Sequence, residues 1–231
     1  MLKFTGFSAQ FPDFLFSLQF IGKTELSEEI KEKYKLIITR PLTHLFHDLT
    51  ETVEGISPDI ETRMQSCVSS MYSDMRFSAG PPLKTYMYLR FREPGRDTDI
   101  PGLYFDMGYD YYTYGIRIYK QTGTGIIKIR AHLLREQKRY AQALREVKRA
   151  GFSVVGESYK KNHYPEISEP NLNDLLNKRY FIICRKEPIS DRVFCGSLAA
   201  ELISGFLELK DTYRLICGHT GDQPDGSQPD G

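Results

Sequence analysis

The sequence predicts an α+β protein in which a central, largely antiparallel sheet packs with helices. Three observations lead to this prediction. Apolar residues recur at helical spacing over the first 55 residues, they alternate with polar residues in the middle third, and they return to the helical period after residue 123. Strands that follow one another with short connections favour antiparallel pairing, which leaves one face of a sheet free of the core.

Residues 1–60 are expected to form a layer of helices. The first helix follows Pro12, the second is capped by Thr24 or Ser27 and runs to Ile38, and the third begins near Pro41. Each carries an apolar stripe that can face a sheet. The stripe residues are Phe14, Leu15, Leu18 and Ile21 in the first helix and Leu42, Leu45, Phe46 and Leu49 in the third.

Residues 68–120 are expected to form most of the sheet. Strict alternation from Lys84 to Arg92 predicts the clearest strand, and further strands are predicted at Leu103–Met107 and Tyr111–Tyr119. In the first strand the apolar residues share one face, and the other face is lined by Lys84, Tyr86, Tyr88, Arg90 and Arg92. If Ile116 and Ile118 point inward, then Thr113, Arg117 and Tyr119 extend this polar face.

The basic segment that follows is expected to form one long helix over residues 124–150. Thr124 and Gly125 open it, and Gly151 is a candidate for the residue that ends it. Between Arg117 and Arg149 there are ten basic residues and two acidic ones. A charge run of this kind is more often a solvated helix face than a grip on membrane or nucleic acid.

The last part of the chain, residues 151–217, is expected to hold a loop, a strand and a helix. Residues 156–177 are polar and predict a loop, 179–185 a C-terminal strand of the sheet, and 198–209 a C-terminal helix. The tail, residues 219–231, repeats Gln-Pro-Asp-Gly and is expected to be disordered. Residues 1–218 then make a single domain.

Composition excludes several classes of protein. Hydrophobic residues make up 40% and charged residues 26%, which excludes disordered and collagen-like chains. The net charge of +1 gives no overall field that would recruit nucleic acid or an anionic membrane, and no apolar run is long enough to span a bilayer. The chain has no tryptophan but 15 tyrosines. No motif predicts a cofactor or a metal ion.

The four cysteines have no spacing typical of a zinc site. Cys67, Cys184, Cys195 and Cys217 are far apart in sequence and include no Cys-x-x-Cys pair. Reduced thiols in a cytoplasmic protein are the favoured interpretation, and two disulfides are the alternative.

The segment from Tyr72 to Thr85 is the densest candidate for chemistry. In an extended chain, Asp74 and Arg76 lie on one face, so the carboxylate can orient the guanidinium for an anion. The turn that follows brings Ser78 and Lys84 within reach of the same anion. The alternative is a structural ion pair between Asp74 and Arg76 that fixes the loop to the sheet.

The same segment resembles a known family. The run Tyr72-Ser-Asp-Met-Arg-Phe-Ser78, then Pro82-Leu-Lys-Thr85, then Pro101-Gly-Leu-Tyr104, is similar to the hallmark of the uncharacterised bacterial family called domain of unknown function 2461. The resemblance covers most of the chain and implies a fold rather than an activity. Ser73 stands where the family has arginine, Leu83 where it has tyrosine, and an acid–lysine pair of the family is missing near Gly80, so this chain is expected to have altered or lost part of any family site.

These observations lead to two main hypotheses of function, and a third possibility is an interaction protein whose family site has decayed. The first is a protein that binds a small anionic ligand or a protein partner on the polar sheet face, with no identifiable catalysis. Its predicted binding residues are Arg76, Ser78, Lys84, Tyr86, Tyr88, Arg90, Tyr104 and Arg117. Nucleic acid is a less favoured partner, because no RNA-recognition motif accompanies the tyrosines. The second hypothesis is a hydrolase or phosphoryl-transfer enzyme with Asp74 and Glu157 as acid and base, and with Arg76 and Lys84 stabilising charge.

Overall fold

A five-stranded antiparallel sheet forms the centre of the protein in this computed structural model, which describes residues 3–74, 80–94, 101–118 and 123–218. The predicted α+β class is confirmed. The strand order is β1-β2-β3-β5-β4, so the C-terminal strand β5 joins the sheet beside β3. The strands are β1 (Met87–Arg92), β2 (Pro101–Met107), β3 (Tyr111–Ile118), β4 (Ser153–Val155) and β5 (Ile182–Pro188).

The pairing register explains why one face of the sheet is apolar. Leu89 pairs with Phe105, and Phe105 pairs with Tyr114, so large buried side chains form a continuous row across three strands. Ile116 and Ile118 point to the same face and are buried, as the alternation predicts. The predicted strands at Leu103–Met107 and Tyr111–Tyr119 are therefore confirmed as β2 and β3, with Tyr119 itself outside the described residues.

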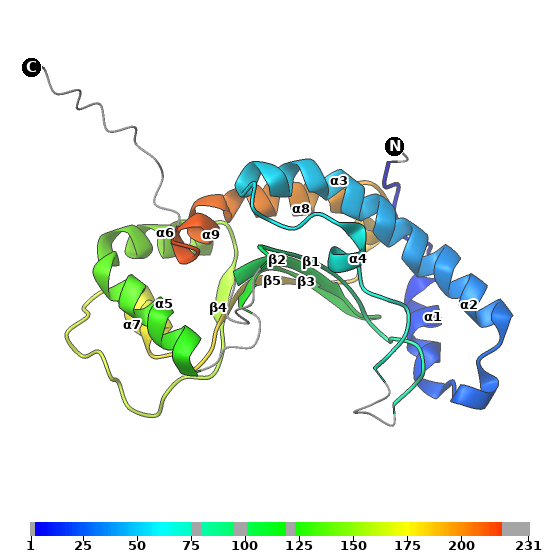
Figure 1. Ribbon diagram of the computed structural model, residues 1–231, viewed down its shortest axis with the longest axis horizontal. Coiled ribbons are helices and arrows are strands. Elements are labelled where there is room, and N and C mark those ends of the chain that lie inside the picture. Colours follow the sequence, from blue (N-terminus) through cyan, green and yellow to red (C-terminus); the bar gives the residue numbers. More distant parts are fainter. Residues whose placement is uncertain (1–2, 75–79, 95–100, 119–122, 219–231) are drawn as a thin grey trace, which may run out of the picture.

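Two helices cover this apolar face (Figure 1). They are α3 (Arg40–Ile56) and α8 (Ser197–Glu208), which pack against one another above the strands. The Phe46 ring of α3 stacks on Phe91 of β1 at 5.8 Å between ring centroids. Phe206 of α8 lies edge-on to both Phe91 and Tyr114, at 6.4 Å from each. Aromatic contacts of this kind fix the distance between the helical layer and the sheet.

The N-terminal helices follow the predicted order. They are α1 (Phe11–Ser17) and α2 (Glu28–Tyr34), and a π-helical turn over Lys35–Thr39 joins α2 to α3. Ser27 is the residue that caps α2, because its hydroxyl oxygen accepts a hydrogen bond from the Ile30 amide at 3.3 Å.

The predicted long helix over residues 124–150 is wrong in one respect, because it is two helices. They are α5 (Gly123–Arg135) and α6 (Gln137–Arg149), and Glu136 between them has a non-helical backbone with φ −108° and ψ 34°. Residues 135–139 are all polar, so no apolar side chain holds the two helices in one line. Tyr140 of α6 contacts the C-terminal helix of the described chain, since its hydroxyl donates to the Leu215 carbonyl at 2.9 Å.

Gly151 ends α6 as predicted. Its φ of +83° is a left-handed conformation that favours glycine, and the Phe152 amide donates back to the Val147 carbonyl at 3.1 Å. The short strand β4 begins at Ser153, and its three residues are too few for an alternation pattern to predict it.

The predicted loop over residues 156–177 contains a helix, α7 (Pro170–Leu176). The Glu169 carboxylate accepts from the Leu172 amide at 2.7 Å, and Pro170 occupies the first turn. The predicted strand at 179–185 begins later, as β5, and the helix predicted at 198–209 is α8. Two further helices were not predicted. They are α9 (Lys210–Ile216), which follows α8, and α4 (Met64–Cys67), which precedes the sheet. The predicted disordered tail, 219–231, lies outside the described residues.

The second face of the sheet has a different environment. In Figure 1 the elements form an arch, with α1 at one end and α5 and α7 at the other, and the central strands between them carry no described helix on this side. In the described ranges, none of the helices combines the length and the apolar composition that crossing a membrane requires.

Candidate functional site

The candidate site lies on the face of the sheet opposite α3 and α8, which we call the open face. Alternation along each strand places its residues there, as the polar-face prediction for β1 and β3 anticipates. Side chains of the open face come from all five strands: Tyr88 and Arg90 from β1, Tyr104 and Asp106 from β2, Thr113 and Arg117 from β3, Ile182, Cys184 and Lys186 from β5, and Val155 from β4.

A cavity of about 390 Å³ is hollowed into this face. Its volume lies within the usual range of sites for small molecules. Its walls combine three tyrosines, two cations, one carboxylate and several apolar groups. The principal lining residues are Tyr86, Tyr104, Asp106, Gly108, Tyr111, Thr113, Arg117, Val155, Ile182, Cys184 and Lys186.

Gly115 leaves the middle of the open face without a side chain. The register places it between Tyr104 of β2 and Cys184 of β5. Its φ is +152°, and a Cβ atom there would lie 2.0 Å from the Ile183 carbonyl oxygen. A glycine is therefore required for β5 to pass this close to β3, and its neighbours Tyr104 and Cys184 line the cavity.

Arg117 crosses the open face from β3 to β2. Its Nη1 donates to Asp106 Oδ2 at 2.8 Å, and its guanidinium carbon lies 4.8 Å from the centre of the Tyr104 ring. The side chain thus lies over Tyr104, which is only 1% exposed although it belongs to the open face. Stacking on a ring and pairing with a carboxylate hold the guanidinium in one orientation.

Asp106 is the carboxylate of this pair. Burial raises the pKa of its carboxyl above the ordinary value, while the charges of Arg117 and Arg90 oppose that rise. Its side chain keeps 21% of its surface exposed, so a bound ligand and solvent can both affect it. Asp106 therefore takes up a proton at higher pH than an ordinary aspartate.

Lys186 supplies a second cation to the cavity. Its ammonium lies 3.7 Å from the centre of the Tyr111 ring, on the side of the cavity opposite Asp106. Cys184 lies beside it along β5, and burial raises the pKa of its thiol. A thiol with a raised pKa is mostly protonated near neutral pH, so Cys184 contributes a neutral wall rather than a nucleophile.

The predicted binding residues divide between the cavity and the edge of the sheet. Tyr86, Tyr104 and Arg117 line the cavity. Lys84, Tyr88 and Arg90 form a separate stack outside its lining, in which Arg90 lies 3.8 Å and Lys84 5.0 Å from the centre of the Tyr88 ring. Lys84 also donates to the Ser70 hydroxyl at 3.0 Å. The predicted Arg76 and Ser78 lie outside the described residues.

The two carboxylates of the enzyme hypothesis follow different edges of the sheet. Val68 pairs with Leu89 on the outer edge of β1, and Tyr72, shortly before Asp74, pairs with Leu83. Glu157 follows β4 at the opposite edge, and its carboxylate accepts from Arg179 Nη1 at 3.1 Å. Neither carboxylate is among the lining residues of the cavity, and their roles as acid and base stay a prediction.

Most of the cavity residues were not assigned to the site by the sequence reasoning, among them Asp106, Cys184 and Lys186. The alternation of the predicted strand at 103–107 could have identified Asp106, because residues two apart share a face and Asp106 therefore lies beside Tyr104. Cys184 lies on the same face of its strand as Tyr180. The sequence of the predicted strand at 179–185 does not show that this strand pairs with β3, so Cys184 was not assigned to the open face. Lys186 lies one residue beyond that predicted strand.

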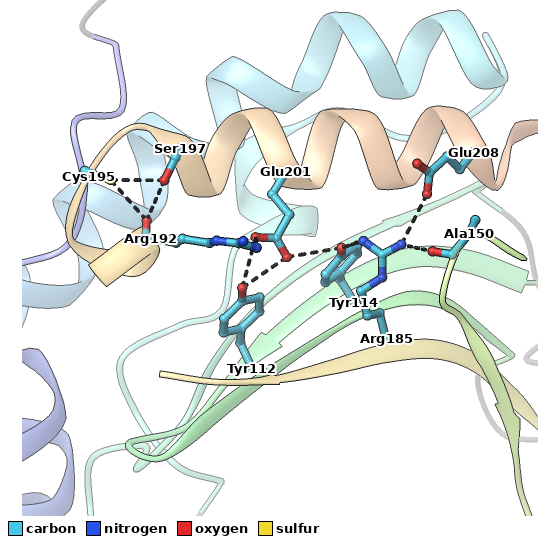
Figure 2. Close-up of polar contacts among 9 residues, drawn as sticks. All are labelled: Tyr112, Tyr114, Ala150, Arg185, Arg192, Cys195, Ser197, Glu201 and Glu208. Atoms are coloured by element: carbon cyan, nitrogen blue, oxygen red, sulfur yellow. Dashed lines mark hydrogen bonds and ion pairs between the residues drawn. The ribbon is translucent and has the colours of Figure 1, made fainter. Parts of the chain in front are cut away.

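A second polar cluster lies on the helix-covered face, and Figure 2 shows it. The Tyr112 hydroxyl donates to Glu201 Oε1 at 3.0 Å, and the Tyr114 hydroxyl donates to the same oxygen at 3.2 Å. Arg185 donates to the Tyr114 hydroxyl at 2.8 Å and also to the Ala150 carbonyl. Burial is the main cause that raises the pKa of both tyrosines. These hydrogen bonds join α8 to β3 and β5.

The four cysteines, all free, should differ strongly in reactivity. Cys195 is exposed, and its hydrogen bond with Ser197, 3.0 Å between sulfur and oxygen, lowers the pKa of its thiol (Figure 2). Burial raises the pKa of Cys67 to about 11 and that of Cys217 to about 12. Iodoacetamide near pH 7.5 is expected to alkylate Cys195 at least about tenfold faster than the others, measured by peptide mass spectrometry. Equal labelling of Cys67 and Cys195 would contradict this.

Comparison with known proteins places the chain in a family. A search of curated proteins finds no match. The model of a family described as a conserved hypothetical protein matches residues 10–214, which include all five strands and both helices over the sheet. The resemblance seen in the sequence is thereby confirmed, and the chain belongs to the family called domain of unknown function 2461.

Proposed function

We propose that this protein binds a small molecule with a carboxylate or phosphate group in the cavity of the open face. One observation carries the proposal: two cations, Arg117 and Lys186, line the same cavity with a single carboxylate, Asp106. Asp106 engages Nη1 of Arg117, while a guanidinium has five N–H donors. Among the described residues, Lys186 makes no ion pair. The cavity walls therefore carry a net positive charge.

The shape of the site favours a small ligand over a protein partner. A hollow of about 390 Å³ has the size of a small-molecule site, whereas stable protein interfaces need about 800 Å² of surface from each partner. The apolar groups Val155 and Ile182 can contact the uncharged part of the ligand. The single domain, the cytoplasmic location and the bacterial origin stay predictions from the sequence.

Removing the cations tests the proposal. Inorganic phosphate, benzoate and phenyl phosphate are titrated by calorimetry and by thermal shift, because a ligand that binds the folded state raises the melting temperature. We expect Lys186→Met and the double variant Arg117→Met/Asp106→Asn each to weaken binding at least about tenfold, since each removes a charge-assisted contact. The double variant avoids leaving Asp106 half-buried without its partner.

The matched control is Arg149→Met, which removes an exposed cation at the end of α6, away from the cavity lining. It should bind each probe as the wild type does. The proposal fails if no probe raises the melting temperature, or if the cavity variants bind as tightly as the control.

Binding should also depend on pH through Asp106. A carboxylate competes with the ligand for Arg117, and protonation removes this competition. Because the pKa of Asp106 is raised, the protonated form begins to accumulate at higher pH than for an ordinary aspartate, so affinity should rise as pH falls. Sulfate is the probe, since its own charge is constant between about pH 5 and 8. Asp106→Asn should bind several-fold more tightly near pH 7.5 and show no such pH dependence; an unchanged profile in this variant would refute the assigned role of Asp106.

A further inference from the structure

We infer that the anion carries a flat ring, and that this ring lies between Tyr86 and Tyr111 above Gly108. The inference rests on the proposed function, because it assigns the uncharged part of the same ligand. All three residues belong to the lining of the cavity. The ligand class is therefore an aromatic carboxylate or an aryl or nucleoside phosphate.

The register produces a slot at one end of the cavity. β1 pairs with β2 up to Met87 and Met107, and Tyr86 and Gly108 are the next residues of the two chains. Gly108 in turn pairs with Tyr111, since its amide donates to the Tyr111 carbonyl at 2.9 Å. If the register continues by one residue, the backbones of Tyr86 and Tyr111 lie on either side of a residue without a side chain, about two interstrand spacings or 9.5 Å apart.

This width suits a ring. Two van der Waals contacts of about 3.5 Å each, one to either tyrosine, need about 7 Å between the flanking groups. Gly108 offers room below, because a Cβ atom built on it would meet nothing closer than Asp110 Oδ1 at 3.6 Å. A planar ring can therefore enter the slot without displacing the backbone.

The two tyrosines leave part of their apolar surface exposed, although the Tyr86 ring lies 6.2 Å from that of Tyr88. Tyr86 is 47% exposed and Tyr111 40% exposed, in contrast to the covered Tyr104 of the same cavity. β3 lies between β2 and β5, so Lys186 reaches Tyr111 from the β5 side, whereas Gly108 lies on the β2 side. The face of Tyr111 toward the slot is the one available for stacking.

The cations lie at the right place for an anion joined to this ring. The Lys186 ammonium lies 3.7 Å from the Tyr111 ring centre, on the side of that ring away from the slot, and Arg117 is held by Asp106 on the β2 side of the cavity. A carboxylate or phosphate joined to a ring in the slot would extend past the edge of Tyr111 to reach Lys186. Stacking would supply affinity that a bare anion lacks, as it does where bases stack on aromatic side chains.

Filling the slot tests the inference. Gly108→Leu places a side chain between the tyrosines at a position where the backbone is open to one, and Tyr86→Leu removes one wall. Phenyl phosphate, cyclohexyl phosphate and inorganic phosphate are titrated against the full-length protein and both variants. We expect the wild type to prefer phenyl phosphate over each of the other two by about tenfold, and both variants to lose that preference while binding inorganic phosphate as before.

The outcomes separate the inference from the proposed function. If cyclohexyl phosphate binds as well as phenyl phosphate, or if both variants keep the preference for the ring, the slot assignment is overturned while anion binding stands. If none of the three phosphates binds to the wild type, the proposed function itself fails. A melting curve of each variant shows that it is folded, and benzoate against cyclohexanecarboxylate repeats the comparison for a carboxylate ligand.

Discussion

Replacing Gly115 with alanine is expected to lower the free energy of unfolding by about 3 kcal/mol or more. The new Cβ atom would lie 2.0 Å from the Ile183 carbonyl oxygen and 2.9 Å from the Cα of Cys184. Both are backbone atoms of β5, which is paired on its two sides and cannot move away alone. The φ of +152° adds strain for any residue with a side chain.

Thermal and urea unfolding measure this effect. For a chain of this size, about 3 kcal/mol corresponds to a fall of roughly 6–12 °C in melting temperature. The matched control is Gly55→Ala in α3, where an added Cβ meets no atom within 4 Å. Alanine favours a helix over glycine, so this variant should be as stable as the wild type or more stable by up to about 1 kcal/mol. If Gly115→Ala unfolds like the control, the close approach of β5 is wrong.

Gly115 also shows which features of the site the sequence could predict and which it could not. Alternation in a single strand predicted which residues of β1 and β3 share the polar face, because a period of two is a local property. Tyr86 and Arg117 were assigned to a binding face on this basis, and both line one cavity together with Tyr104. Nothing local to Gly115 indicates that β5 passes across it, since that depends on a strand about 70 residues later.

Other parts of the site depend on the register between strands. Arg117 reaches Asp106 because β2 and β3 pair so that Gly102 lies opposite Arg117 and Asp106 opposite Thr113. The sequence alone cannot give this diagonal, nor the entry of Lys186 from β5. The break between α5 and α6 was missed for a related reason, because α6 contacts a distant segment: its Tyr140 donates to the Leu215 carbonyl of α9, 75 residues later in the chain.

Replacing Glu201 with leucine is expected to be the second most destabilising change, by about 2–4 kcal/mol. Its carboxylate accepts hydrogen bonds from the hydroxyls of Tyr112 and Tyr114, which are 1% and 0% exposed as residues. Leucine has a similar size but no acceptor, so both hydroxyl protons would lose their partner in a site that water barely reaches. Arg185 cannot replace the carboxylate, because a guanidinium only donates.

Two further variants separate these hydrogen bonds from a general effect of changing α8. Glu208 lies on the same helix, and its ion pair with Arg185, 3.4 Å between nitrogen and oxygen, is partly exposed. Glu208→Leu should therefore cost no more than about 1 kcal/mol, as exposed ion pairs contribute little. Tyr112→Phe should destabilise the wild type but be close to neutral in the Glu201→Leu background, because the hydroxyl then has no acceptor left to lose. Urea unfolding of the wild type, the two single variants and the double variant gives the coupling energy between Tyr112 and Glu201, which we expect to be about 1–2 kcal/mol. A value near zero would mean that Glu201 does not hold Tyr112 and that α8 is fixed to the sheet by its apolar contacts alone.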